Sequence, residues 1–420
     1  MASLAVLLII LGCAAFQYFK GTVVKAFATI IIAICASIVA FNYFELLSTF
    51  FIGRGGNSRF PSLIPWAQPL CFALLFVLAF AILQTAIIQI TRKPVDLGFL
   101  PERIGRIICG IFLGLIMSGL LLTTFAMAPL PNKYPYQRFD ETNPAAQKPD
   151  KVFLNADGFN AGWFSLVSRG SFRAIRNPRS FGVLHPAFLD QLFLNRHNDS
   201  GGIPLVTSAE SIVVPSKNGA WYAPVTGIKG ADDKPIITES NHRLVTVRMG
   251  IKKIAITDAG KFTLAQLRLV CKQEGDGTGF VGKGINIYPI GYFSGENRIQ
   301  TKKLSELITV SRDDFDGKDT TKYIDFAFNV PDNYEPVLLE FKLNNIVEVP
   351  RLVSAEQAPA PSPFVEGSRS GKETKTRKKS AEQRQPESPP SIQKQPNRRS
   401  RNQGLSDVSK SIVGDEFDEE

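Results

Sequence analysis

The sequence predicts a membrane α-helical protein with four transmembrane helices, followed by a soluble α+β, mainly-β domain and a disordered tail. Three observations predict this class: apolar stretches fill the first 130 residues, a period of two begins at Arg243, and large apolar residues become rare from Ala355 onward. The averages over 420 residues, 44% hydrophobic and 20% charged, resemble an ordinary globular protein and describe none of these parts. This uneven distribution excludes a wholly soluble enzyme.

Four stretches are long and apolar enough to cross a hydrocarbon core, which is about 30 Å thick and needs roughly 20 helical residues. Backbone groups inside the core must bond to one another, so we expect each stretch to be a helix. The four helices are expected at Ala2–Phe19, Thr22–Leu46, Ala67–Ile90 and Ile107–Ala128. The connection at Lys20-Gly21 is so short that the first two helices should form a tight antiparallel hairpin.

The connections between these helices differ in their Lys and Arg content, which sets the orientation of a membrane protein. The first and third connections carry Lys20, Lys25, Arg92, Lys93, Arg103 and Arg106. The second connection and the segment after the fourth helix carry Arg54, Arg59, Lys133 and Arg138. This excess predicts that the first and third connections lie in the cytoplasm, and that both termini and the C-terminal domain lie outside it.

The interiors of the predicted helices contain neutral polar residues such as Asn42, Thr85 and Ser118, while Glu45 lies near a helix end. A transporter or proton channel usually holds ionisable groups at membrane depth. We therefore interpret the neutral groups as hydrogen-bond partners between helices. A small-solute channel formed by an oligomer of the membrane part is kept as an alternative function.

Short motifs of the membrane part resemble a known family. They are Lys20-Gly21 between the first two helices, Glu102-Arg103 leading into the fourth helix, and Gly110 and Gly114, whose spacing lets another helix approach closely. On these residues, roughly Met1–Leu130 resembles the colicin V production protein (CvpA) family of bacterial inner-membrane proteins. The family has Arg-Gly, Asp-Arg and two glycines at these places.

The sequence also departs from that family. Leu113 stands where the family has an Arg before the last glycine, no Asp opens the first helix, and the family's Leu-Gly is replaced by a shifted Gly105-Arg106. The resemblance implies an inner-membrane protein tied to toxin export, envelope homeostasis or biofilm traits. It implies no defined catalytic chemistry in the membrane part.

A polar, Pro-rich linker is predicted at residues 131–152 and a soluble domain at 153–352. Apolar residues around Phe164 and Phe188 have helical spacing and indicate short helices on the sheet or at the membrane surface. Five strands are expected at Arg243–Met249, Phe262–Lys272, Ile285–Ile290, Lys322–Asn329 and Pro336–Leu343. Such strands with turn-rich spacers suggest an antiparallel β-sandwich, a fold that hosts binding more often than chemistry.

One loop resembles the nucleophile loop of trypsin-like proteases. Residues 198–206 read Asn-Asp-Ser-Gly-Gly-Ile-Pro-Leu-Val, which would make Ser200 the nucleophile. That chemistry needs a His base and a buried Asp on a β-barrel, whereas His185 and His197 lie in a predicted helical segment directly before Ser200. A plain turn is the preferred interpretation, and a membrane-anchored serine hydrolase acting on envelope material is kept as an alternative function.

Two further loops resemble ligand sites but lack residues that the chemistry requires. Residues 277–284 have the Gly-x4-Gly-Lys spacing of a phosphate loop, but no Ser or Thr follows Lys283 and a strand is expected from Ile285. An acidic run consists of Asp313, Asp314, Asp316 and Asp319. It lacks the ligand order of an EF-hand, so the only alternative kept for it is loose binding of a cation. Three scattered histidines and five cysteines without a Cys-x-x-Cys pair predict no zinc site. We therefore expect no catalytic residue, cofactor or metal.

The tail at residues 353–420 is predicted to be disordered. Ordering it would cost about 1–2 kcal/mol per residue, with almost no apolar side chains to offset that cost. Between Glu366 and Arg401, eleven Lys and Arg stand against four Glu, which accounts for most of the net charge of +10. This basic block suits an anionic polymer, while the acidic end at 414–420 suits electrostatic contact with the basic block.

These features together predict a multi-pass protein of the bacterial inner membrane whose C-terminal domain binds partners outside the cytoplasm. The expected function is an envelope scaffold or an accessory of secretion and toxin production, without catalysis. The expected partners are membrane lipids, envelope proteins, further copies of the chain in a homo-oligomer, and an anionic polymer on the basic tail.

Overall fold

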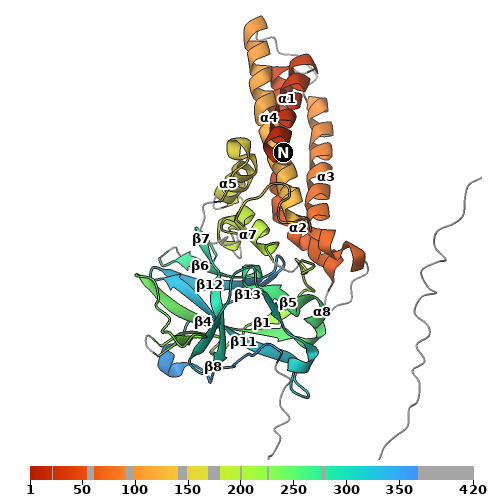
Figure 1. The fold of residues 1–420 in the computed structure, drawn as a ribbon. Coiled ribbons are helices and arrows are strands. Elements are labelled where there is room, and N and C mark those ends of the chain that lie inside the picture. Colours follow the sequence, from red (N-terminus) through yellow and green to blue (C-terminus); the bar gives the residue numbers. More distant parts are fainter. Residues whose placement is uncertain are drawn as a thin grey trace, which may run out of the picture. The chain divides into compact units, whose positions relative to one another are not determined.

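The computed structural model describes residues 1–20, 22–53, 61–90, 98–140, 149–168, 180–198, 201–224, 227–275 and 280–367. The chain divides into two compact units, Met1–Gly371 and Lys372–Glu420. All described residues belong to the first unit, in which a helix bundle extends from a group of β-sheets (Figure 1). Most of the predicted tail therefore lies outside the described residues.

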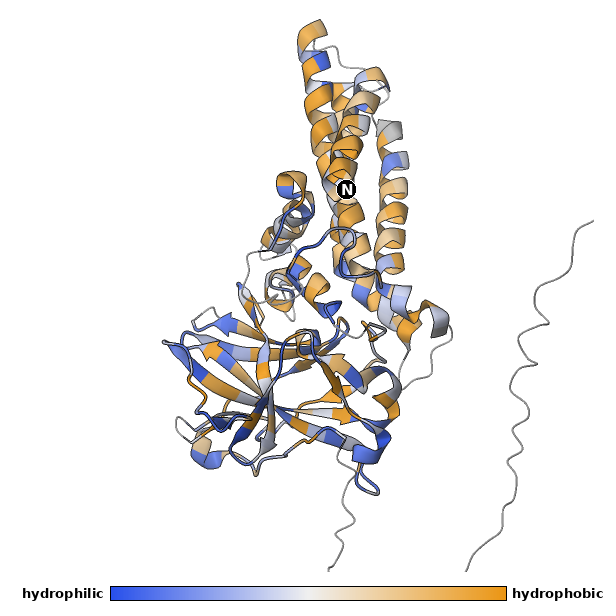
Figure 2. Cartoon of the chain, in the orientation of Figure 1, coloured by the Kyte–Doolittle hydropathy of each residue, from blue (hydrophilic) through white to orange (hydrophobic). Residues whose placement is uncertain are grey.

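Four long helices form the bundle: α1 (Ala2–Lys20), α2 (Val23–Ile52), α3 (Ala67–Ile90) and α4 (Phe99–Met127). Each is long and apolar enough to cross a membrane, which confirms the four predicted spans. Most residues of these four helices are hydrophobic (Figure 2), and many of their large apolar side chains are exposed. α4 begins at Phe99 instead of Ile107, because Pro101 stands in its first turn, where a missing N–H costs no intrahelical hydrogen bond.

The direction of each helix places three helix ends near the sheets (Figure 1). Gly53, which follows α2, accepts a hydrogen bond from the backbone N–H of Ala209. Gln68 at the start of α3 donates to the carbonyl of Leu343 at 3.0 Å. The chain also leaves α4 at this end, so the sheets follow the helices without crossing the bundle.

The neutral polar residues expected to link helices bond within their own helices. The Asn42 side chain donates to the Ile38 carbonyl at 2.8 Å. The Thr85 and Ser118 hydroxyls each donate to a carbonyl three residues earlier. The interpretation as links between helices is corrected for these three residues, because the nearest acceptor is a carbonyl of the preceding turn.

Three short helices lie between the bundle and the sheets: α5 (Ala156–Ser168), α6 (Phe181–Leu184) and α7 (Phe188–Asn195). α5 packs directly on α4, where the Asn160 amide donates to the Ile116 carbonyl at 2.7 Å. At Gly119 of α4 the approach is so close that an added Cβ would lie 2.2 Å from the Ala156 carbonyl oxygen. α5 therefore lies against the membrane helix itself.

The described part of the predicted linker is packed. The Arg138 guanidinium pairs with Asp190 of α7 at 2.6 Å and donates a hydrogen bond to the Tyr136 hydroxyl at 2.7 Å. That hydroxyl donates to Asp157 of α5 at 2.5 Å. Because Arg138 is buried and paired, residues 134–140 hold α5 and α7 together instead of serving as a free spacer.

The remainder forms three sheets. Their strands are β1 (Ile212–Val213), β2 (Ala220–Tyr222), β3 (Lys229–Gly230), β4 (His242–Lys252), β5 (Lys261–Thr263), β6 (Leu267–Gln273), β7 (Gly284–Ile287), β8 (Pro289–Gly295), β9 (Arg298–Thr301), β10 (Leu307–Thr309), β11 (Thr321–Pro331), β12 (Tyr334–Phe341) and β13 (Asn345–Glu348). One sheet has the order β1-β4-β11-β8-β9-β3, with β2 also on β4; a second has β13-β12-β6-β7; the third pairs β10 with β5. Among the described strands, every pairing is antiparallel except β3 with β9.

The predicted strands all fall in these sheets, with two corrections. A 3₁₀ segment at Leu264–Gln266 divides the strand expected at Phe262–Lys272 into β5 and β6. The strand expected at Ile285–Ile290 is also two strands, because β7 and β8 belong to different sheets and the chain crosses between them at Tyr288. Alternation of side chains along a sequence does not show where a chain changes sheets.

The two larger sheets share one hydrophobic core. Val247 of β4 and Phe326 of β11 contribute from one sheet, and Leu269 of β6 and Phe341 of β12 from the other. All four side chains are fully buried. This common core joins the two sheets into one β-rich body.

The folded part extends to Gly367, beyond the predicted boundary at residue 352. Phe364 is buried in the common core, and its backbone N–H donates to the Phe293 carbonyl. The Ala360 carbonyl accepts from Arg248 at 2.7 Å, and the Ser362 N–H donates to Asp325 at 2.8 Å. The predicted disorder of residues 353–367 is therefore corrected: one aromatic side chain and several backbone hydrogen bonds hold this segment on the sheet.

Candidate functional site

The layer between the bundle and the sheets contains an aromatic cluster centred on Phe41 of α2. The Phe41 ring stacks on Phe164 of α5, with centroids 4.8 Å apart, and meets Phe72 of α3 edge-on at 5.0 Å. Phe181 of α6 and Phe188 of α7 also contact it edge-on. Offset and edge-on ring pairs add to the stability that burial confers. Five helices therefore meet at one membrane-helix residue.

A charged pair lies on the outer face of the four-stranded sheet. Arg268 of β6 and Glu340 of β12 are directly opposed in the antiparallel register, so their side chains share one face. Their neighbours Leu269 and Phe341 point to the other face, into the common core. The two charged groups form a hydrogen-bonded ion pair, and both are almost completely buried because α6 and α7 cover this face.

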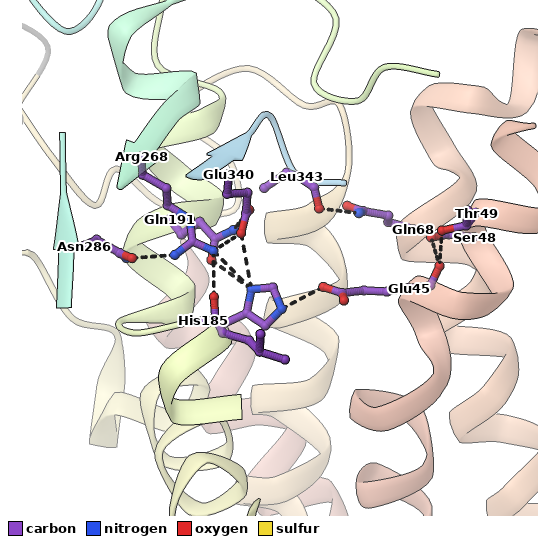
Figure 3. A network of polar contacts seen from close by, with 11 residues as sticks. Glu45, Ser48, Thr49, Gln68, His185, Gln191, Arg268, Asn286, Glu340 and Leu343 are labelled. Atoms are coloured by element: carbon purple, nitrogen blue, oxygen red, sulfur yellow. Dashed lines mark hydrogen bonds and ion pairs between the residues drawn. The ribbon is translucent and has the colours of Figure 1, made fainter. Parts of the chain in front are cut away.

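His185, directly after α6, joins this pair to the membrane helix α2 (Figure 3). Its Nε2 lies 2.8 Å from a carboxylate oxygen of Glu45, and its Nδ1 lies 3.9 Å from a carboxylate oxygen of Glu340. The same Nδ1 lies 3.3 Å from the guanidinium of Arg268. Each imidazole nitrogen thus faces a carboxylate, one from the membrane part and one from the sheet.

The amides of Gln191 and Asn286 complete this group. We call Glu45, His185, Gln191, Arg268, Asn286 and Glu340 together the junction cluster (Figure 3). Gln191 of α7 donates to Glu340, and Asn286 of β7 accepts from Arg268. Arg268 also donates to the Leu184 carbonyl at 3.0 Å. Because two carboxylates face a guanidinium and an imidazole, the cluster is electrically balanced when His185 is protonated.

The electrostatics favour that protonated form. Burial alone would lower the pKa of His185, but Glu45 and Glu340 together outweigh burial and raise this pKa above its ordinary value of 6.5. Burial raises the pKa of Glu340, against the opposing effect of Arg268 and His185. The raised pKa favours the charged form of His185, which can pair with both the carboxylate of α2 and the carboxylate of the sheet.

We expect the stabilisation from His185 to depend on pH. A group whose pKa is raised on folding contributes its full stability below its unfolded pKa of about 6.5 and loses it as the pH rises through the folded pKa. The difference in unfolding free energy between the wild type and His185→Gln should thus be largest near pH 6 and shrink toward pH 9. Each tenfold change in proton affinity corresponds to about 1.4 kcal/mol. Denaturant unfolding of the purified protein over this pH range measures the difference.

His242→Gln is the matched control, because His242 is part-exposed and lies 3.8 Å from exposed Glu239. The free energy of unfolding of His242→Gln should be close to that of the wild type, because a part-exposed ion pair contributes little to stability. If the difference in unfolding free energy between the wild type and His185→Gln stays constant or grows from pH 6 to pH 9, the raised pKa of His185 is contradicted.

The structure places the motif residues of the membrane part at the ends and the inner face of α4. Glu102 accepts a hydrogen bond from the Val23 N–H at 3.0 Å and pairs with Arg106 at 2.7 Å, so it joins the start of α4 to the start of α2. Arg103 lies over the ring of Phe99, 4.0 Å from its centroid. Lys20 is the last residue of α1, and Gly21 lies outside the described residues.

Gly110 and Gly114 lie against the backbone of α1. A Cβ added at Gly110 would be 2.5 Å from Cα of Ala14, and one added at Gly114 would be 2.6 Å from Cα of Ile10. The partner helix that approaches these glycines is thus α1 of the same chain.

The structure bears on the three loops that resemble catalytic or ligand sites in the sequence. Ser200 lies outside the described residues, and His185 is engaged by the junction cluster. β7 begins at Gly284, directly after Lys283, where a phosphate loop requires a helix. Asp314 accepts hydrogen bonds from Ser311 and stabilises a 3₁₀ turn. Within the described ranges, no group of three or more His, Cys, Asp or Glu is placed to hold a metal ion.

Comparison of the chain with protein-family models, with curated proteins and with solved structures gives no match. The resemblance of residues 1–130 to the colicin V production protein family therefore stays a prediction.

The junction cluster was not predicted from the sequence, although two signals are present. Arg268 and Glu340 each stand between two large apolar residues of a predicted strand, a pattern that leaves a charge on the face opposite the core. Glu45 is an acid near the end of an apolar helix. Neither signal identifies the partner, because more than 130 residues separate Glu45 from His185.

Proposed function

We propose that this protein is an inner-membrane scaffold of the bacterial envelope, a secretion or toxin-production accessory that holds a sandwich-type binding domain in a fixed position on its membrane helices. The junction cluster is the observation that carries this proposal. Through His185 it links a carboxylate of α2, whose side chain is 35% exposed, to the buried Arg268–Glu340 pair of the four-stranded sheet. A domain that only needed a tether would require no such site.

The structure supports a fixed attachment through independent contacts. Gln68 of α3 donates to the Leu343 carbonyl at the end of β12, and both groups are buried. Phe41, Phe72 and Leu343 belong to one buried hydrophobic cluster, so apolar side chains pack around this contact. Because buried polar groups bond in one geometry, the domain has one orientation on the helices.

The charge difference between the connections favours a domain outside the cytoplasm, and the resemblance of residues 1–130 favours the bacterial inner membrane. Envelope proteins, lipids and further copies of the chain are the partners that fit this location. A reporter active only outside the cytoplasm and one fluorescent only inside it, each fused after Glu420, test the orientation. Fluorescence of the inside reporter without activity of the outside reporter would place the C-terminal domain in the cytoplasm and contradict this orientation.

Complementation tests the scaffold role. In cells that lack the protein, Ser200→Ala and Lys283→Ala should restore toxin export and envelope integrity as well as the wild type does. The double variant Gln68→Ala/His185→Ala should not restore them at equal protein level, because it loosens the domain from α2 and α3. Loss of function in Ser200→Ala, together with labelling of Ser200 by a reactive-serine probe, would replace the scaffold by a hydrolase.

Spin labels test the fixed orientation directly. We expect labels at Ile82, exposed on α3, and Lys229, exposed on β3, to give one narrow distance distribution in a variant without native cysteines. The distribution should broaden in Gln68→Ala/His185→Ala. An equally broad distribution in the parent would contradict the proposed rigid attachment.

A further inference from the structure

Arg196, directly after α7, is a buried cation that pairs with no carboxylate of the described residues. It is only 2% exposed, and none of its three guanidinium nitrogens has a hydrogen-bond partner within that part of the chain. The guanidinium carbon lies 4.7 Å from the centroid of the Phe193 ring. Burial lowers the pKa of Arg196 to about 10, which still leaves the group charged at neutral pH. A buried unpaired charge is strongly unfavourable unless something supplies the missing partner.

A pocket of about 450 Å³ lies beside Arg196. Its wall comes from the segment after α4, Pro129–Asn132, and from Asn198, Gly201, Gly202, Ile203 and Leu205. The described lining residues include no carboxylate, so Arg196 is their only formal charge. The apolar part of this wall begins two residues after the last residue of the membrane helix α4.

We propose that this pocket binds a phosphate-type oxyanion, with the Arg196 guanidinium as its cationic anchor. The planar guanidinium presents five N–H donors and matches two phosphate oxygens at once. The Asn198 amide, which donates to the Arg196 carbonyl at 2.9 Å and accepts from the Gly201 N–H, and the backbone of Gly202 are further polar groups on the pocket wall. A small turn of the buried Arg196 side chain into the pocket completes the contact.

The position of the pocket provides two sources for this anion. Because the pocket opens at the end of α4, the headgroup of an anionic phospholipid can enter it, with Leu130 and Ile203 against its apolar part. Free phosphate can bind the same donors without the apolar contacts. The chemistry is the same in both cases, and only the source differs.

The test uses the full-length purified protein and its thermal unfolding midpoint. Inorganic phosphate is titrated in detergent, and the protein is compared in nanodiscs of phosphatidylcholine alone and with phosphatidylglycerol added. At a hundredfold excess over the dissociation constant, binding should raise the midpoint by about 3 °C. A rise with phosphate assigns a free oxyanion, and a rise only with phosphatidylglycerol assigns a lipid headgroup; either result supports the site.

Arg196→Met keeps the side-chain volume and removes the charge. We expect it to abolish the anion-dependent rise and to raise the midpoint measured without anion, because the unpaired charge is gone. Arg312→Met, at an exposed arginine, should keep the full rise. No rise in either arm, or a rise unchanged in Arg196→Met, would overturn the proposal. So would a marked loss of stability in Asp199→Asn measured without anion, because a carboxylate of the chain would then be the partner of Arg196.

Discussion

Replacing Arg268 by alanine is expected to lower the free energy of unfolding by about 3–5 kcal/mol, because it removes the closest counter-charge of the buried Glu340 and leaves two carboxylates facing one imidazole. The same change removes the donors to Asn286 and to the Leu184 carbonyl. Denaturant unfolding of the purified protein measures the loss. The spin-label distances from the bundle to the sheets should broaden in the same variant.

Two further variants separate the buried charge from the loss of side-chain volume. Arg268→Met/Glu340→Leu removes both charges and fills their space, so it should recover most of the lost stability. Arg298→Ala breaks a pair in which both side chains are more than half exposed, and should change the stability little. If Arg268→Ala behaves like Arg298→Ala, the Arg268–Glu340 pair does not stabilise the junction.

Replacing Gly110 or Gly114 by leucine is expected to separate α1 from α4. Even a Cβ at these positions would lie within 2.6 Å of a Cα of α1, and a backbone atom cannot move away without shifting the helix. Overpacking of this kind costs about 1–3 kcal/mol at each site. We expect a lower unfolding temperature in detergent and faster proteolysis of the first helix.

Gly12 of α1 provides the matched control. It lies in a membrane helix, and an added Cβ would meet no atom within 4 Å. Gly12→Leu should therefore leave the unfolding temperature nearly unchanged. Equal destabilisation by Gly12→Leu and Gly114→Leu would show that bulk in a membrane helix, and not the contact with α1, causes the effect.

The four membrane helices could be predicted because length and composition alone decide whether a segment can cross a bilayer. Their bounds were less certain: the predicted end of α2 at Leu46 left out the turn that follows Glu45, and the structure extends this helix to Ile52. Glu45 of the junction cluster therefore lies inside this helix, and Gly53 directly after its end accepts a hydrogen bond from Ala209. Residues 47–52 are mostly apolar, so apolar composition alone did not mark where the helix ends.

The strands were predicted by their period of two, but their assignment to sheets was not. β7 and β8 are one apolar run in the sequence and belong to two sheets in the structure. Phe364 stands in a polar, Pro-rich segment and lies in the common core. A single aromatic residue contributes little to the average hydropathy of a polar segment, yet it orders the chain when its ring fits into the core.

The sequence by itself determined the class of this protein: membrane spans, a strand-rich part and a basic tail follow from hydrophobicity, periodicity and charge, which are properties of neighbouring residues. Only the tertiary structure decided which charges meet. Glu45, His185, Arg268 and Glu340 come from α2, the end of α6, β6 and β12, and they are brought together by the packing of the bundle against the sheet. Arg196 shows the converse, a charge that has no partner among the residues that the structure describes. Both outcomes depend on three-dimensional position, because burial makes a charge costly and only proximity can compensate it.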